Sequence, residues 1–252
     1  MKLLTLARDL QRRKARERLD LFVAEGVRAA EELLRSPLAP RGLLVSPGLV
    51  HAARGSALLT AAYGRGIPVE EVSDRDFDTA SDTESPQGVL AIAEIPRGSL
   101  ETLALPETAR VVVLDSLQDP GNVGTILRTA AAFGAAVTVA LPGTVDLWNA
   151  KVVRSAMGAL FHRPATTATW EELDRFLGST GTVLWGTDRS GVALEQLVAP
   201  PRLALALGNE GGGHSPAARM RIAQSVSISI GSDVDSLNVA VAAGILLHHF
   251  RP

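Results

Sequence analysis

Three segments of this 252-residue chain combine glycines with polar side chains in patterns that could do chemistry. They are DSLQDPGNVGTILRTAAAFG (115–134), LGNEGGGHS (207–215) and SISIGSDVDSLNVAVAAGILL (227–247). Glycine permits positive φ angles and lets a ligand approach the backbone closely. If the three segments share one edge of a sheet, they form a pocket built largely from main-chain N–H and C=O groups. Such a pocket suits an adenine-containing cofactor, although the residues alone do not identify one.

The polar side chains of these segments supply charge and hydrogen bonds to that pocket. They are Asn122, Arg128, Glu210, Ser236 and Asn238. Each segment also has an ordinary explanation: Asn122 can cap a helix, the glycine cluster can be a flexible connection, and the third segment can be a helix N-cap. By itself, Arg128 is compatible with a surface charge, a phosphate contact or an active-site residue.

The elements around these segments predict a doubly wound α/β domain. From residue 109 onward, short and nearly continuous apolar runs alternate with helical patterns, as in parallel strands covered on both faces. Ligands of such sheets bind beyond the carboxyl ends of the strands, and the three segments follow strands. The predicted strands are 110–115, 136–140, 182–186, 203–208 and 226–230.

The N-terminal part predicts a separate, small α/β unit. We expect an N-terminal domain over 1–97, a linker over 98–108 that is poor in periodic pattern, and the larger domain over 109–252. Within the first domain, the patterns predict helices over 19–34, 56–63 and 74–80, and strands over 42–46, 67–72 and 88–95.

Composition excludes several classes of protein. Hydrophobic residues make up 46% and charged residues 21% of the chain, so it can bury a core. The chain has no cysteine, which excludes disulfides and Cys-based zinc sites, and its five histidines lack metal-ligand spacing, so we expect no metal. We expect a cytoplasmic, soluble protein because no signal peptide and no long apolar span stand out. The dinucleotide, P-loop and nucleophile-elbow motifs are missing.

The N-terminal segment 8–18 is basic although the net charge of the chain is −2. Six basic residues stand there against two acidic ones, which fits either a solvated helix face or a patch that meets phosphates. The candidate RNA-binding residues are Arg12, Arg13, Arg16 and Arg18, together with Arg128.

The three segments resemble, in order, the three motifs of the SpoU (TrmH-type) RNA 2′-O-ribose methyltransferases of the SPOUT superfamily. DPGNVGTILRTAAAFG resembles the first motif, LALALGNEGGG the second and VSISIGSDVDSLNVAVAAGILL the third. LFVAEGVRAAEELL (21–34) and SPQGVLAI (85–92) resemble segments of the family's substrate-binding domain. The chain departs from the family at Ile228-Ser229-Ile230, where Ile-Pro-Met is common.

The resemblance implies S-adenosylmethionine as the cofactor, a C-terminal parallel-sheet α/β domain with a trefoil knot, and a homodimer. It places the catalytic groups at Asn122, Arg128, Glu210, Ser236 and Asn238. It places cofactor contacts, largely through the main chain, at Leu207, Gly208, Asn209, Gly211, Ile228, Ile230, Ser236 and Leu237.

The implied reaction is methyl transfer to a ribose 2′-hydroxyl, most simply of ribosomal RNA. A tRNA substrate and a non-catalytic RNA-binding or ribosome-assembly factor on the same fold are the alternatives. In the family, the arginine at the position of Arg128 activates the hydroxyl, yet a guanidinium normally keeps its protons. Either Arg128 loses a proton transiently, or it stays charged while water or Glu210 takes the proton.

Overall fold

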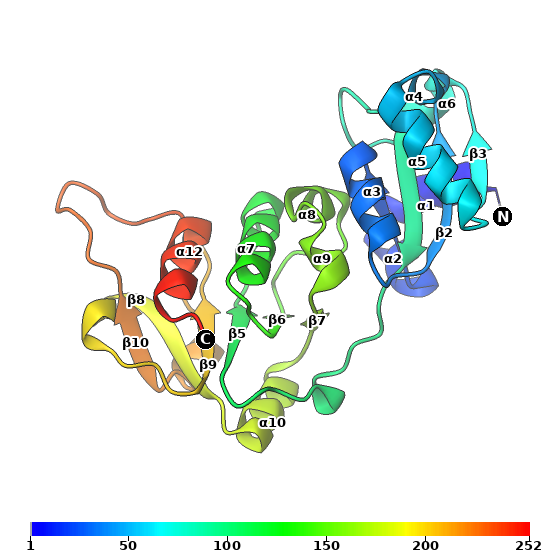
Figure 1. Ribbon diagram of the computed structural model, residues 1–252. Helices are drawn as coiled ribbons and strands as arrows, with labels where there is room; N and C mark the ends of the chain where they lie inside the picture. The colour runs from blue at the N-terminus through cyan, green and yellow to red at the C-terminus, as the bar shows by residue number, and fades with distance from the viewer. Residues whose placement is uncertain (1) are drawn as a thin grey trace. The chain divides into compact units, whose positions relative to one another are not determined.

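The computed structural model describes residues 2–252, which form two compact units (Figure 1). The first comprises the chain up to Arg97 together with Trp148–His162, and the second comprises Gly98–Leu147 and Arg163–Pro252. The chain thus enters the second unit at Gly98 and returns to the first unit over Trp148–His162. The domain boundaries drawn along the sequence stay a prediction.

The first unit is built on a four-stranded sheet in the order β1-β4-β2-β3. β4 is antiparallel to both of its neighbours, whereas β2 and β3 run parallel, as expected for strands joined through helices. The strands are β1 (Leu21–Glu25), β2 (Pro40–Val45), β3 (Val69–Glu71) and β4 (Val89–Glu94).

Short helices cover this sheet, and one of them differs from the prediction. The helix predicted over 19–34 is wrong in its first half, because residues 21–25 form the fully buried strand β1. Asp20 and Gly26, with φ angles of 52° and 98°, turn the chain on either side of that strand. The helices are α1 (Leu3–Leu10), α2 (Arg13–Leu19), α3 (Val27–Arg35), α4 (Pro47–Val50), α5 (Ala53–Gly64) and α6 (Asp74–Asp78).

The segment 148–162 packs into the first unit through aromatic rings. It carries the short helices α8 (Ala150–Ser155) and α9 (Ala159–His162). The ring centroid of Phe22 in β1 lies 4.5 Å from that of Trp148 and 5.6 Å from that of Phe161. Each buried aromatic ring contributes a large apolar area to packing. The segment therefore covers β1, the edge strand of the sheet.

The second unit contains a six-stranded, entirely parallel sheet in the order β10-β8-β9-β5-β6-β7, which confirms the predicted α/β class. β7 has no counterpart among the predicted strands, and β8 runs beyond its predicted end. The strands are β5 (Ala109–Leu114), β6 (Val137–Ala140), β7 (Ala165–Thr167), β8 (Val183–Ala193), β9 (Arg202–Leu207) and β10 (Gln224–Ser227).

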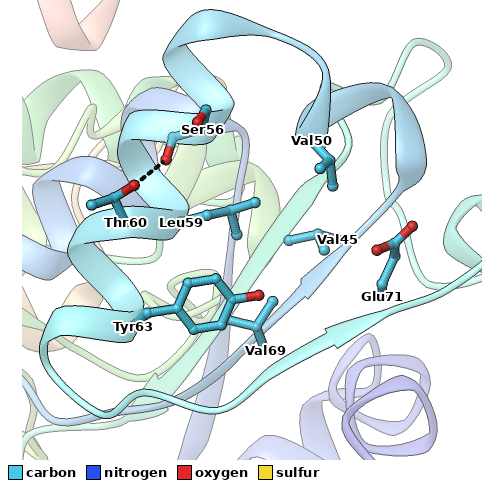
Figure 2. A pocket seen from close by; sticks show the side chains of 8 residues that line it. All are labelled: Val45, Val50, Ser56, Leu59, Thr60, Tyr63, Val69 and Glu71. Carbon is cyan, nitrogen blue, oxygen red and sulfur yellow. Dashed lines mark hydrogen bonds between the residues drawn. The ribbon is translucent and has the colours of Figure 1, made fainter.

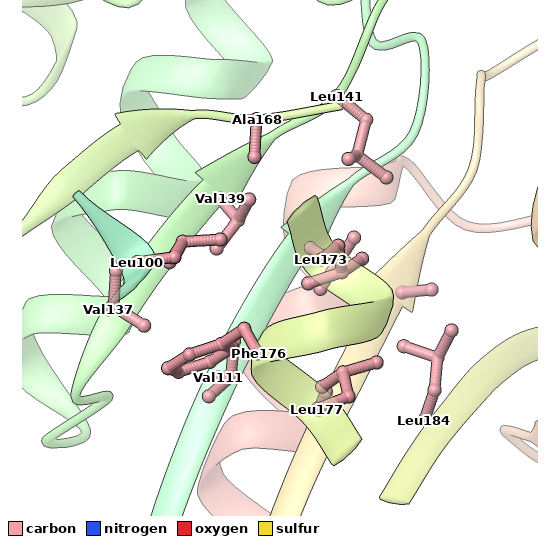
Figure 3. Close-up of a cluster of buried hydrophobic side chains, with 13 residues drawn as sticks. Leu100, Val111, Val137, Val139, Leu141, Ala168, Leu173, Phe176, Leu177 and Leu184 are labelled. Atoms are coloured by element: carbon pink, nitrogen blue, oxygen red, sulfur yellow. The ribbon is translucent and has the colours of Figure 1, made fainter. Parts of the chain in front are cut away.

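Helices cover both faces of this sheet. On one face, Leu173, Phe176 and Leu177 of α10 (Trp170–Thr180) pack against Val111 and its neighbours (Figure 3). Successive side chains of a strand point to opposite faces, so the equally buried Val112 turns away from this cluster. The remaining helical elements are α7 (Pro120–Ala132), α11 (Pro216–Arg219), α12 (Val239–His249), η1 (Leu100–Thr102) and η2 (Leu194–Gln196).

α7 and α12 lie side by side, and they bring the first and third polar segments together (Figure 1). The second polar segment follows β9, which is the sheet neighbour of β5. All three segments therefore meet at the carboxyl edge of one sheet. Within residues 2–252, no helix is both long and apolar enough to cross a membrane.

Candidate active site

The loops at this edge enclose a cavity of about 330 Å³ in the second unit. That volume is at the lower end of the size of small-molecule sites. Its walls come from the loop after β9, from a bulge within β8 and from the segment between β10 and α12. The lining residues are Thr187, Asp188, Arg189, Gly208, Asn209, Glu210, Gly213, Val226, Ile228, Ile230, Ser236, Leu237, Asn238, Val239 and Ala242.

Most of the predicted cofactor residues line this cavity, and two do not. Those that do are Gly208, Asn209, Ile228, Ile230, Ser236 and Leu237. Leu207 is only 1% exposed and belongs to the sheet core, so it supports the cavity from behind. Gly211 lies in the exposed loop, where its N–H donates to Asn209 Oδ1 at 3.0 Å.

The start of α7 differs from the prediction. Asp119, not Asn122, is the N-cap, and its Oδ1 accepts from the backbone N–H of Asn122 at 2.7 Å. Pro120 occupies the first helical position, where its missing N–H costs nothing. The side chain of Asn122 is thus released from capping and can reach the other two polar segments.

Asn122, Glu210 and Asn238 form a hydrogen-bonded chain that we call the amide relay. Asn238 Oδ1 caps α12 by accepting from the N–H groups of Ala240 and Val241, at 2.9 and 3.3 Å. Its Nδ2 donates to Asn122 Oδ1 at 3.0 Å, and Asn122 Nδ2 donates to Glu210 Oε1 at 2.8 Å.

The direction of the amide relay follows from its first member. Because Asn238 Oδ1 accepts from two backbone donors, the Nδ2 of Asn238 must point at Asn122. Asn122 then presents its oxygen to Asn238 and its own NH₂ group to Glu210. The start of α12 therefore fixes the orientation of the Glu210 carboxylate through two amide side chains.

Arg128 lies outside the relay. α7 begins at Pro120, which puts Arg128 in its third turn. Its side chain is exposed, and among residues 2–252 it has neither a hydrogen bond nor an ion pair. Glu210 pairs with Asn122. Ser236 lines the cavity and does not cap α12, since Asn238 does.

A second polar chain, missed by the sequence analysis, lies behind the cavity. Asp115 and His214 are 1% and 7% exposed. Asp115 Oδ2 accepts from the N–H of Ser215 at 2.7 Å and lies 3.6 Å from His214 Nδ1. His214 Nε2 accepts from the N–H of Thr187 at 3.0 Å. We call Asp115, His214 and the Thr187 amide the imidazole relay.

Two carboxyls at the site have lowered pKa values. Burial by itself raises the pKa of Asp115, but the His214 imidazole and the hydroxyl and N–H of Ser215 outweigh burial and bring it below its usual range. The Ser190 hydroxyl and N–H donate to Asp188 and lower the pKa of its carboxyl. Asp188 lines the cavity, so it presents a negative charge to a bound ligand.

The N-terminal arginines separate into two groups. Arg16 is 4% exposed, and its Nη1 donates to the carbonyls of Leu10 and Gln11, at 2.7 and 2.9 Å, where α1 ends. Its prediction as an RNA contact is wrong, because the guanidinium is buried as a helix cap. Arg12, Arg13 and Arg18 are exposed, and Arg13 pairs with Glu17.

The first unit has a hollow of its own, of about 270 Å³, between α5 and the strands β2 and β3 (Figure 2). None of the predicted site residues lines it. The exposed ring of Tyr63 and the carboxylate of Glu71 are its most prominent polar-tipped side chains (Figure 2). Within residues 2–252, no group of three or more His, Asp or Glu side chains is placed to hold a metal ion.

Comparison with known proteins assigns the family. The model of the SpoU rRNA Methylase family matches residues 109–248, and an MRM3-like substrate binding domain matches residues 5–91. The chain belongs to the SpoU rRNA methylase family, which confirms the resemblance of the three motifs.

Individual relatives agree with this assignment. The chain is 31% identical to the 23S rRNA (guanosine(2553)-2′-O)-methyltransferase RlmP of Bacillus subtilis, over 97% of this chain and 94% of that protein. Its fold is similar to the AdoMet-bound rRNA methyltransferase from Sinorhizobium meliloti, with a TM-score of 0.87 and 28% identity over 99% and 94% of the two chains. The AviRb SpoU methyltransferase of Streptomyces viridochromogenes, solved with AdoMet, has a TM-score of 0.87 at 27% identity over 99% and 96%.

Proposed function

We propose that this chain transfers the methyl group of S-adenosylmethionine to a ribose 2′-hydroxyl of ribosomal RNA. The observation that carries this proposal is the amide relay, which joins all three polar segments at the mouth of one cavity. Family membership and the names of the relatives favour ribosomal RNA over tRNA. A non-catalytic factor would have no use for a carboxylate oriented in this way.

The cavity fits S-adenosylmethionine by its chemistry. Ile228, Leu237 and Ala242 offer an apolar surface to an adenine ring. Asp188 and Glu210 are negative and suit a cofactor that carries a sulfonium and an ammonium group. Arg189 lines the same cavity and can pair with the carboxylate of the cofactor's amino-acid end.

The cofactor, when bound, supplies a methyl group already activated by the positive sulfur. The residues of the chain then have to hold the 2′-oxygen of the ribose in line and to receive or direct its proton. Glu210 is the acceptor that the amide relay orients. In residues 2–252, its Oε2 has no hydrogen-bond partner and is open to a substrate hydroxyl.

We assign Arg128 to the phosphate next to the target ribose. Its guanidinium is exposed and unpaired within residues 2–252, so it is available to an anion at no cost of breaking an internal bond. In this assignment Arg128 keeps its charge and stabilises the developing alkoxide, while Glu210 or water takes the proton.

The homodimer, the trefoil knot and the cytoplasmic location are parts of the same proposal. Val241 and Ile245, one turn apart on α12, are 51% and 36% exposed and line an open hollow of about 480 Å³. Exposed apolar side chains on one helix face are typical of an interface. The knot rests on family membership, and the location rests on the ribosomal substrate and the absence of cysteine.

A methylation assay tests the function. Purified protein and labelled S-adenosylmethionine are incubated with ribosomal RNA that lacks native modification, and 2′-O-methylation is mapped by alkali-resistant linkages. We expect label at one position, and turnover reduced at least about a hundred-fold by Arg128→Ala at saturating RNA. The matched control is Arg175→Ala, an exposed arginine on α10 that pairs with Glu101 and should leave turnover unchanged. Binding of the cofactor with no label on RNA or on ribosomal particles would contradict the proposal.

A further inference from the structure

We propose that His214 is a positioning residue that fixes one wall of the cofactor cavity by holding the backbone of Thr187. The geometry behind this proposal is the imidazole relay, which ties the carboxyl ends of β5 and β9 to the middle of β8, the sheet neighbour of β9. Asp115 follows β5, His214 belongs to the loop after β9, and Thr187 lies within β8. The inference rests on the proposed function, because it takes the cavity to be the S-adenosylmethionine site.

The wall in question is a bulge that the strand ladder skips, and at its far end Ser227 Oγ of β10 donates to the Gly191 carbonyl at 2.9 Å. Between β10 and β8, Ser225 pairs with Gly186 and the next residue, Val226, pairs with Val192. The residues from 187 to 191 are therefore skipped by the ladder. Three of them, Thr187, Asp188 and Arg189, line the cavity. A bulge without ladder bonds needs another anchor if it is to keep one shape.

His214 supplies that anchor at the first residue of the bulge. Its Nε2 accepts from the Thr187 N–H at 3.0 Å, and the Thr187 hydroxyl lies 3.5 Å from the same nitrogen. Gly186 packs so closely on the ring that a Cβ there would lie 3.0 Å from Nε2. At Gly208, a Cβ would lie 2.8 Å from the backbone N of His214. His214 thus packs between Gly186 in β8 and Gly208 after β9, with its ring against the first and its backbone against the second.

The hydrogen bonds define the state of the imidazole. Nε2 accepts from a backbone N–H, so it carries no proton, and the proton of the neutral ring is on Nδ1. Nδ1 is buried, has no hydrogen-bond partner in residues 2–252 and faces Asp115 Oδ2 at 3.6 Å. That distance is too long for a hydrogen bond, but a carboxylate so placed favours the Nδ1–H form. Asp115 therefore keeps Nε2 available to Thr187.

The test compares two amide variants that differ only in reach. The amide of His214→Gln extends to about the place of Nε2 and can accept from the Thr187 N–H, whereas that of His214→Asn extends only to the place of Nδ1. Binding of S-adenosylhomocysteine is measured by calorimetry, and KM for RNA and thermal stability without the cofactor are measured alongside.

We expect His214→Gln to bind S-adenosylhomocysteine within about two-fold of the unchanged protein and His214→Asn to bind about five- to ten-fold more weakly, as for the loss of one hydrogen bond. KM for RNA stays the same in both, and both lose a similar amount of thermal stability. A purely structural histidine predicts equal affinities for the two variants. Equal affinities, or tighter binding by His214→Asn, would overturn the proposal.

A third variant keeps the test decisive if His214→Asn does not fold. His214→Leu fills the place of the ring but offers no acceptor, so the Thr187 N–H loses its partner while Asp115 keeps its bond to the Ser215 N–H. The affinity for S-adenosylhomocysteine should then fall about five- to ten-fold relative to His214→Gln. Unchanged affinity would overturn the inference. If the unchanged protein itself does not bind S-adenosylhomocysteine, the proposed function fails first.

Discussion

The cavity is flanked by two polar chains that differ in exposure and in what they hold. The amide relay has an exposed carboxylate at one end, Glu210, and its links are side chain to side chain. The imidazole relay is buried, and both of its side chains bind backbone N–H groups: Asp115 accepts from Ser215 and His214 from Thr187. The first chain leaves an atom free to act on a substrate, whereas the second leaves none.

Because the two relays differ in exposure, different effects are expected when each of them is changed. A buried hydrogen bond to the backbone determines the position of a loop, and its loss is felt as stability or as affinity for the cofactor. An exposed side chain with an open acceptor determines a rate, because its contribution is made in the transition state. The two chains should therefore separate in kinetics, and the following experiments test that separation.

The largest effect is expected at the open end of the amide relay. Glu210→Gln keeps an oxygen for Asn122 Nδ2 but removes the negative charge and most of the basicity. If Glu210 receives the ribose proton, kcat falls about a hundred-fold or more while S-adenosylhomocysteine binds within about three-fold of before. Single-turnover rates with saturating RNA measure this. A rate within about three-fold of the unchanged protein would assign the proton to water instead.

The next effect concerns the buried chain and depends on pH. The folded-state pKa of Asp115 is lowered, because burial, which raises it, is outweighed by His214 and Ser215. The charged carboxylate thus contributes stability that is complete above its unfolded pKa of about 3.9 and is lost as pH falls through the lower folded value. Asp115→Asn should lower the free energy of unfolding by about 2 kcal/mol at pH 7, with the difference shrinking below about pH 4.

Urea denaturation at a series of pH values measures this difference. Asp78→Asn is the control, since Asp78 is exposed at the end of α6. A difference between Asp115→Asn and the unchanged protein that stays constant down to pH 3 would mean that the charge of Asp115 does not stabilise the fold.

The same contrast between buried and exposed groups recurs among the N-terminal arginines. Arg16→Ala leaves the carbonyls of Leu10 and Gln11, at the end of α1, without their side-chain donor. It should destabilise the protein by about 1–2 kcal/mol with no change in RNA affinity. Arg18→Ala should leave stability unchanged, weaken RNA binding and reduce its dependence on salt by about one unit of slope. Binding titrations at several salt concentrations distinguish the two. A salt slope that falls in Arg16→Ala would contradict the burial of its side chain.

The sequence predicted which loops form the site, but not which of their side chains bond to one another. Glycines and polar residues after three strands could be recognised because parallel strands bring their carboxyl ends to one edge. The cap of α7 was missed although the sequence held a signal for it: proline is typical of the first helical position, so Asp119 before Pro120 is the N-cap. The partner of Glu210 could not be predicted, because it depends on how α7 and α12 pack.

The sequence also did not show which charged and polar residues are buried. Arg16 has the same charge as Arg12 and Arg18 and stands in the same basic segment, and only its contact with the end of α1 shows that it is buried. His214 had a usable signal: it is a lone histidine directly after three glycines at the end of a strand. Its partner Asp115 also ends a strand, so the parallel sheet could have suggested the pair.

The smallest effect separates the two roles of Asn238. Asn238→Ala removes the cap of α12 and should cost about 1 kcal/mol of unfolding free energy. Asn238→Asp keeps the cap but sets a carboxylate oxygen against Asn122 Oδ1, so stability is retained while the orientation of Asn122 is lost. We expect kcat to fall about five-fold in Asn238→Asp, as for one weakened hydrogen bond. If kcat is unchanged in the Asp variant and in Asn238→Ala, Asn122 and Glu210 act as a pair on their own and Asn238 serves the helix alone.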